Sequence, residues 1–89
     1  MGQRFLGAVL LALTPILAIA QKQDSIQQVV YQQALKKMEE KDLAAASLQF
    51  TQLITSNFTN KEVFVKRGII YFQQNDYAKA KADFDEAVK

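Results

Sequence analysis

The sequence predicts an all-α fold built from two tandem helix-turn-helix hairpins. The chain has 89 residues but only one Pro and three Gly, a scarcity of turn formers that favours helices over a turn-rich β fold. Apolar residues recur at intervals of three and four along four segments, which is the period of an amphipathic helix. The strongest indication is an internal repeat, because the segment from Gln27 corresponds to the segment from Lys61 at an offset of 34 residues.

The repeat is carried mainly by apolar and small positions, where a repeated packing unit has to keep its residue types. Two conservative pairs, Ala34 with Gly68 and Leu35 with Ile69, support it. Five further pairs are identical at this offset: Val29 and Val63, Asp42 and Asp76, Ala44 and Ala78, Ala46 and Ala80, Phe50 and Phe84. The sequence therefore predicts two copies of one hairpin.

The first hairpin is expected to begin at a capping box, Asp24–Gln27, with Asp24 as the helix cap. A polar turn at residues 39–42 ends its first helix, and Asp42 is placed to cap the second. The apolar stripes of the two helices are Ile26, Val29, Val30, Ala34, Leu35 and Met38, followed by Leu43, Ala46, Phe50, Leu53 and Ile54.

The second hairpin repeats this plan. Thr59–Glu62 has the form of a capping box, and residues 74–76 form the next turn. The apolar stripes are Phe64, Val65, Gly68, Ile69, Tyr71 and Phe72, followed by Tyr77, Ala80, Phe84, Ala87 and Val88.

Composition excludes several kinds of site. The chain has no Cys, His or Trp, so it has no disulfide, no metal site that needs Cys or His ligands, and no base for Ser-His-Asp or Cys-His catalysis. Acidic and basic residues are interspersed at a net charge of +2, without the basic stripe of a nucleic-acid-binding protein. We expect the carboxylates, and the basic pair Lys66 and Arg67, to lie on solvated helix faces. The chain is therefore predicted to be neither an enzyme nor a cofactor binder.

Residues 1–20 have the order of a secretory signal peptide. Arg4 provides the positive n-region, residues 5–20 are apolar except for Thr14, and Ala18 and Ala20 form a small-x-small cleavage site before a polar start at Gln21. The alternative is an uncleaved anchor, but sixteen apolar residues interrupted by Pro15 are short for a span of about 20. The predicted division is a signal peptide at 1–20, a lead-in at 21–26, one repeat at 27–60 and a second, incomplete at its C-terminal end, at 61–89.

The 34-residue period and the hairpin in each unit resemble the tetratricopeptide repeat family, and residues 61–89 resemble it most. The resemblance implies a short right-handed α-solenoid and a non-catalytic role in binding proteins. The positions that hold the family's bulky, small and aromatic slots here are Ala34, Ala46, Phe50, Gly68, Tyr71, Tyr77, Ala80, Phe84 and Ala87. By the same resemblance, Gly68 and Ala80 lie where the two helices of a hairpin cross, and Phe84 and Ala87 face the packing between hairpins.

In this family the first helix of each hairpin lines a concave groove. Matching slots imply an apolar strip that could take a peptide or a partner helix. The strip, with one flanking cation, consists of Tyr31, Leu35, Val65, Lys66, Ile69 and Phe72. The alternative is that this strip is core or is covered by a further helix.

Solenoids normally stack about three or more repeats. We therefore expect further repeats after Lys89, or self-association through the uncovered last helix. The favoured hypothesis is an exported scaffold, periplasmic or secreted, that binds a protein or peptide and meets a membrane only through its signal peptide before cleavage. The alternatives are a luminal co-chaperone module of a secretory pathway, for which the sequon Asn57–Thr59 would be reachable by glycosylation, and the interaction region of a larger enzyme.

Overall fold

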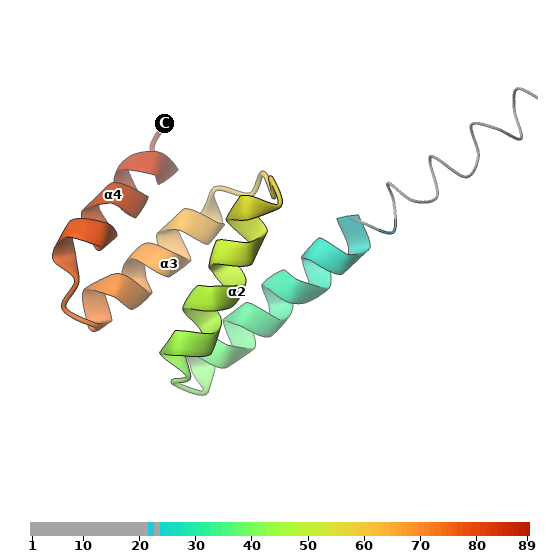
Figure 1. The fold of residues 1–89 in the computed structure, drawn as a ribbon, viewed down its shortest axis with the longest axis horizontal. Coiled ribbons are helices and arrows are strands. Elements are labelled where there is room, and N and C mark those ends of the chain that lie inside the picture. Colours follow the sequence, from blue (N-terminus) through green and yellow to red (C-terminus); the bar gives the residue numbers. More distant parts are fainter. Residues whose placement is uncertain (1–21, 23) are drawn as a thin grey trace, which may run out of the picture.

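A computed structural model describes residue 22 and residues 24–89, which form four helical segments and no strand. The first helical segment covers residues 24–39 and is followed by α2 (Leu43–Thr55), α3 (Glu62–Gln73) and α4 (Tyr77–Ala87). These segments pair into a first hairpin (residues 24–55) and a second hairpin (residues 62–87), with α3 lying between α2 and α4 (Figure 1). The all-α prediction with helical hairpins is confirmed.

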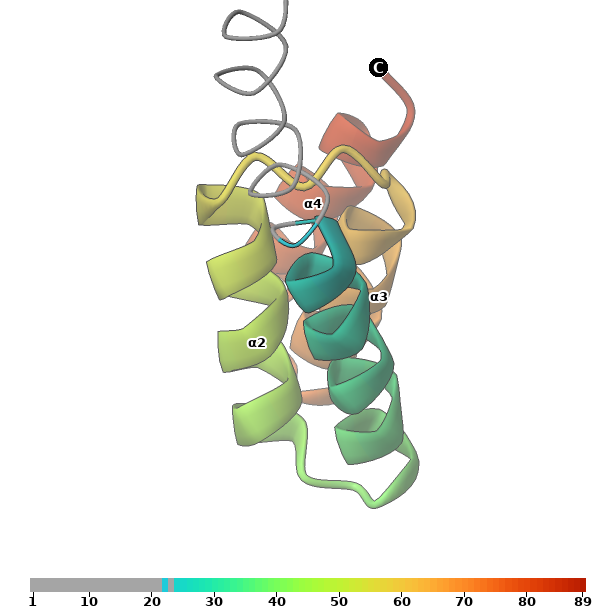
Figure 2. The same cartoon turned by 90° about the vertical axis from the view of Figure 1, so that its right-hand side faces the viewer.

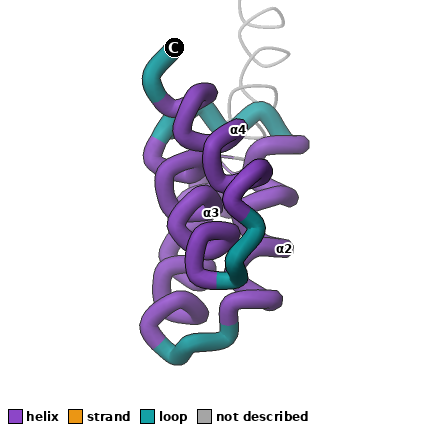
Figure 3. The backbone as a smooth tube through the Cα atoms, turned by 90° about the vertical axis from the view of Figure 1, so that its left-hand side faces the viewer, coloured by secondary structure: helices purple, strands orange, loops and turns teal. Residues whose placement is uncertain are grey.

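The two hairpins are stacked one behind the other. Figure 2 looks along the stack, with the first hairpin in front and the second behind it. Both hairpin turns lie at the same end of the helices, and the loop that joins α2 to α3 lies at the opposite end (Figure 3). Each hairpin is therefore a structural unit, and the α2–α3 loop carries the chain from one unit to the next.

The two hairpin turns have the same backbone geometry at an offset of 34 residues. Lys41 and Asn75 both have a left-handed conformation, with φ of 64° and 65°. Asp42 and Asp76 cap the following helices, each accepting at 3.3 Å from the backbone N–H three residues later. Their own N–H groups donate to carbonyls five residues back, at 2.9 Å and 2.8 Å. Both turns and the Asp42 cap are confirmed, and the repeat appears in hydrogen bonds as well as in sequence.

Two predicted helix starts are wrong. Asp24 is itself helical, as is residue 22, so Asp24 does not cap the first helical segment. Thr59 does not cap α3 either: that helix starts at Glu62 after Lys61, which makes no side-chain cap. The oxygen that accepts there belongs to Asn60, whose Oδ1 lies 3.0 Å from the Glu62 backbone nitrogen. A short capping motif fits several registers, and tertiary packing chooses among them.

The core lies where the two hairpins meet. Its buried members come from the first helical segment, α2 and α3: Tyr31, Ala34, Ala46, Phe50, Leu53, Val63 and Ile70. Val30, Leu35, Met38, Leu43, Ile54 and Phe58 pack around them. The predicted stripe of α2 is thus the stripe that is buried. Burial of these side chains against the neighbouring hairpin supplies the main stabilisation, since short isolated helices are marginal in water.

Two of the predicted stripes differ from the observed packing. Ile26 and Val29 were expected to face the core, yet they are 52% and 55% exposed. In α3, Val63 and Ile70 are fully buried although neither belongs to the predicted stripe. The reason is that α3 has neighbours on two sides, so it buries one set of residues against α2 and another against α4.

Within the second hairpin, α3 and α4 approach closely at Gly68. A Cβ atom added to Gly68 would lie 2.6 Å from the Phe84 ring, so a side chain at this position would have to displace that ring. Gly68 and Ala80 are both buried, as their counterparts Ala34 and Ala46 are. The Phe84 ring therefore packs against Gly68 within its own hairpin, and it also lines a hollow on the outer face of this hairpin, the side that was expected to pack against a neighbouring hairpin.

The predicted signal peptide, residues 1–20, lies outside the described residues. None of the helices in the described part of the chain has both the length and the apolar character needed to cross a bilayer.

Candidate protein-interaction surfaces

The predicted groove residues are placed in three different environments. Leu35, Val65, Lys66 and Ile69 are half-buried, and Leu35 also packs against the core. Phe72, near the end of α3, is 57% exposed. The half-buried residues and Phe72 leave apolar surface accessible on the first helical segment and on α3, the first helices of the two hairpins.

Tyr31 is the groove residue that lies deepest. It is 8% exposed and belongs to the core cluster, with its ring edge-on to Phe50 at 6.2 Å and beside Phe58 at 5.7 Å. Burial, and to a smaller extent the nearby Glu62 carboxylate, raises the pKa of the Tyr31 hydroxyl above its usual 10.0. The Tyr31 ring packs between the first helical segment, α2 and the α2–α3 loop. Tyr31 is therefore part of the core beneath the groove and is not one of its accessible residues.

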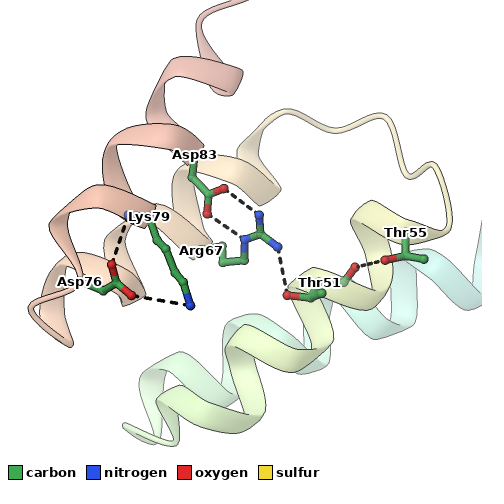
Figure 4. Close-up of polar contacts among 6 residues, drawn as sticks. All are labelled: Thr51, Thr55, Arg67, Asp76, Lys79 and Asp83. Atoms are coloured by element: carbon green, nitrogen blue, oxygen red, sulfur yellow. Dashed lines mark hydrogen bonds and ion pairs between the residues drawn. The ribbon is translucent and has the colours of Figure 1, made fainter.

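A buried ion pair links the two helices of the second hairpin to the first hairpin. Arg67 of α3 makes a two-pronged contact with Asp83 of α4, with Nη2 to Oδ1 at 2.7 Å and Nε to Oδ2 at 2.8 Å (Figure 4). Its Nη1 donates to Thr51 Oγ1 of α2 at 3.0 Å. The side chains of Arg67 and Asp83 are only 16% and 5% exposed. The hydrogen bond to Asp83 raises the pKa of the Arg67 guanidinium, so the Arg67 side chain stays charged at ordinary pH.

This pair corrects two expectations. Arg67 does not lie on a solvated face, and the carboxylates are not all exposed, because Asp83 is buried. A signal was present in the repeat itself: the counterparts of Arg67 and Asp83 are Gln33 and Gln49, so both units place polar residues at these two slots. The Gln49 Oε1 atom is buried and has no hydrogen-bond partner among the described residues.

Tyr71 lies close to two cations. The Arg67 guanidinium carbon and the Lys79 Nζ are each 5.5 Å from the centre of its ring. Lys79 also pairs with Asp76 at 3.7 Å (Figure 4). Such contacts orient the ring and the basic side chains on the second hairpin. These contacts all lie within the second hairpin.

The outer face of the second hairpin carries an apolar hollow of about 340 Å³, which is lined by Phe72, Tyr77, Ala80, Lys81 and Phe84. The rings of Phe72 and Tyr77 meet edge to face at 5.2 Å, and the Tyr77 hydroxyl donates to Asn75 Oδ1 at 3.0 Å. Phe72 and Tyr77 are more than half exposed. The hollow is open and apolar, with one lysine at its edge.

The residues at the predicted repeat positions also differ in burial. Ala34, Ala46, Phe50, Gly68 and Ala80 are buried, Tyr71, Phe84 and Ala87 are half-buried, and Tyr77 is exposed. Asn57 is exposed and has a φ of 61° in the α2–α3 loop. Among the described residues there is no group of three or more acidic, His or Cys side chains that could hold a metal ion. The chemistry these surfaces offer is apolar contact and ion pairing.

The comparison with protein families identifies one of the two hairpins. Residues 61–89 match the tetratricopeptide repeat. No curated protein and no solved structure matches the chain significantly. The second hairpin is thus similar to the tetratricopeptide repeat, a module that generally mediates protein–protein interaction and is typically non-catalytic. The first hairpin lies outside the match but shares the turn geometry of this repeat at the 34-residue offset.

Proposed function

We propose that this protein is a non-catalytic interaction scaffold that binds a peptide or a partner helix along the first helices of its hairpins. The observation that carries the proposal is the strip of Leu35, Val65 and Ile69, which leaves apolar surface partly accessible along the first helical segment and α3. Apolar side chains at helical spacing fit the apolar face of an amphipathic peptide. Lys66 and Phe72, the other two accessible residues predicted for the groove, would add a charge contact and a ring contact.

Tyr31 has a supporting role in this proposal. Because Tyr31 is 8% exposed, it offers little surface to a ligand. Its contacts with Phe50 and Phe58 belong to the core cluster against which Leu35 packs. The binding residues proposed here are therefore Leu35, Val65, Lys66, Ile69 and Phe72.

We further propose that the scaffold acts outside the cytoplasm, in a periplasm or as a secreted protein. The support is the order of residues 1–20, in which a positive start, an apolar run and Ala18–Ala20 precede a polar segment. The exported protein is expected to start at Gln21. An intact-mass measurement checks this; recovery of chains that retain Met1 in the membrane fraction would contradict it.

A displayed library of random peptides, selected on the immobilised protein, tests the binding proposal. The best peptide is then titrated into ¹⁵N-labelled protein. The amide signals of Leu35, Val65 and Ile69 are expected to shift most. Val65→Ser and Ile69→Ser should each weaken binding by roughly tenfold, which corresponds to about 1.4 kcal/mol of lost apolar contact.

Leu48→Ser is the matched control. Leu48 is 60% exposed on α2 and belongs to neither the strip nor the outer hollow, so its loss should leave binding unchanged. Circular dichroism of each variant verifies that helical content is kept. If the selected peptides shift other surfaces only, or if Leu48→Ser weakens binding as much as Val65→Ser, the groove proposal is wrong.

A further inference from the structure

The repeat symmetry indicates what the apolar hollow on the outer face of the second hairpin is shaped to receive. The apolar residues that line it, Phe72, Tyr77, Ala80 and Phe84, have counterparts 34 positions earlier in Met38, Leu43, Ala46 and Phe50. In the first hairpin this set is covered: Ala46 and Phe50 are fully buried, and Met38 and Leu43 pack against the core. The same surface is thus filled in one repeat and open in the other.

The cover of the first hairpin is α3. Val63 and Ile70, seven residues apart, are both fully buried in the cluster that holds Ala46 and Phe50. Between them Arg67 reaches the hydroxyl of Thr51 at 3.0 Å. The side chains that α3 presents to the first hairpin therefore follow a pattern. An aliphatic residue comes first, a basic residue follows four positions later, and a second aliphatic residue follows three positions after the basic one.

The second hairpin offers a stronger partner for the basic residue of such a helix. The counterpart of Thr51 is Asp85, so a carboxylate stands where the first hairpin has a hydroxyl. Asp85 is 59% exposed and pairs with Lys81, which is itself 78% exposed, at 2.8 Å. A surface ion pair of this kind exchanges partners at little cost. Charge and shape on the outer face therefore match one pattern of incoming side chains.

We propose that the outer face of the second hairpin binds an amphipathic helix of a partner protein, with aliphatic residues at positions i and i+7 and Arg or Lys at position i+4. The aliphatic residues fill the hollow against Phe84 and Ala80, and the basic residue pairs with Asp85. This interface continues the packing between the two hairpins by one further step. It is distinct from the groove, with which it shares only Phe72.

A second copy of the chain fits this face less well. The positions of its first helical segment that correspond to Val63, Arg67 and Ile70 are Val29, Gln33 and Lys36. Lys36 would bring an ammonium group into the place of a fully buried isoleucine, and Gln33 would leave Asp85 without a cation. Burying an unpaired charge is costly, so the face selects against this occupant.

A synthetic peptide with the sequence of residues 61–74 is the first probe, because α3 already covers the equivalent surface. Titrated into ¹⁵N-labelled protein, it should shift the amide signals of Tyr77, Ala80, Phe84 and Asp85. A peptide with Arg67→Glu should bind roughly tenfold more weakly, because a like charge then faces Asp85. A peptide with Ile70→Lys, which mimics the first helical segment, should not bind measurably.

Charge reversal on the protein decides the register. The variant Asp85→Arg should lose affinity for the unaltered peptide and recover it for the Arg67→Glu peptide. Asp85 lies at the surface, so circular dichroism and melting of this variant should match those of the original protein. Equal binding of both peptides to both proteins would overturn the proposal, as would shifts confined to α2, which would mean that the peptide replaces α3.

Sedimentation, combined with the peptide titration, tests the alternative that a second copy of the chain occupies this face. If the protein self-associates in sedimentation, if Val29→Asp abolishes this association, and if the peptide competes with it, then a second copy is the occupant and the proposal is wrong. A monomer that binds the peptide with the charge dependence described above supports a partner helix.

Discussion

At the scale of single residues, the Arg67–Asp83 pair is the contact that most clearly joins the parts of the molecule. Arg67 touches α4 through Asp83 and α2 through Thr51, so one side chain ties both helices of the second hairpin to the first. Sequence alone placed Arg67 on a solvated face because its partner lies sixteen residues away, on another helix. Charge pairing at that distance depends on how the helices pack, and no local pattern encodes it.

Removing one partner of this pair should be much worse than removing both. Arg67→Met or Asp83→Leu leaves an uncompensated charge, which in buried pairs costs about 3–5 kcal/mol. Because Arg67 keeps 16% exposure, we expect the lower end of that range. The double variant restores balance and should cost markedly less. Urea unfolding of the four proteins measures the coupling.

The exposed pair of Lys81 and Asp85 is the control for this cycle. Its side chains are 78% and 59% exposed, and replacing Lys81 by Met should leave stability unchanged within error. Additive losses for Arg67→Met and Asp83→Leu would show that the two residues do not interact in solution.

Tyr31 gives the protein a pH dependence in the alkaline range. Its pKa is raised in the folded state by burial and by Glu62, so above pH 10.0, its ordinary pKa, the unfolded chain loses the proton first. The folded state then binds more protons, and the free energy of unfolding falls as pH rises. Below that pH this contribution is fully present.

Tyr31→Phe should flatten this decline, because Phe has no proton to lose. Urea unfolding between about pH 8 and about pH 11 measures the slope for both proteins. Tyr77→Phe is the control, since Tyr77 is 56% exposed. The raised pKa values of Lys81 and Lys89, due to the hydrogen bonds that these lysines donate to Asp85 and Glu86, act equally on all three proteins. An unchanged slope in Tyr31→Phe would contradict the burial of this hydroxyl.

At the scale of helices, local sequence predicts most of what is found. The helical period placed the segments, and Asp42 predicted a cap because the cap needs only a side-chain oxygen before a helix. Local sequence gave wrong predictions where packing against neighbouring helices determines the structure. Asp24 was expected to cap a helix but is itself helical. Val63 and Ile70 were not in the predicted stripe, yet they are buried because α3 packs against other helices on two sides. A search for one apolar stripe per helix finds only one of these two sides.

The contact between α3 and α4 allows a test in which the effect of one substitution on stability changes sign between two backgrounds. Gly68→Ala brings a Cβ to 2.6 Å from the Phe84 ring, and such overpacking costs about 1–3 kcal/mol. The gain in helix propensity from Gly to Ala, about 1 kcal/mol, offsets part of it. We expect a net destabilisation of about 1 kcal/mol.

In a Phe84→Ala background the ring is gone, so Gly68→Ala should stabilise the protein, by up to about 1 kcal/mol. Thermal or urea unfolding of the four proteins gives both differences. Destabilisation by Gly68→Ala in both backgrounds would mean that Phe84 does not pack on Gly68.

At the scale of the whole molecule, the 34-residue period organises both the packing and the surfaces. The family match covers residues 61–89 only, but the two turns share their φ angles, caps and hydrogen bonds, so the first hairpin follows the same plan. The sequence predicts the two hairpins correctly because the same pattern of residues occurs in both units. The groove residues are harder to predict, because the exposure of each depends on how far one hairpin is displaced from the next.

The stacking of the two hairpins is the central claim, since the groove and the outer face both depend on it. Nuclear Overhauser effects between the Phe50 ring and the methyl groups of Val63 and Ile70 test it most directly, because these residues share one buried cluster across the α2–α3 boundary. The account predicts cross-peaks from Phe50 to at least one of these two residues, alongside those from Phe50 to Tyr31 within the first hairpin. Cross-peaks within each hairpin but none between α2 and α3 would contradict it.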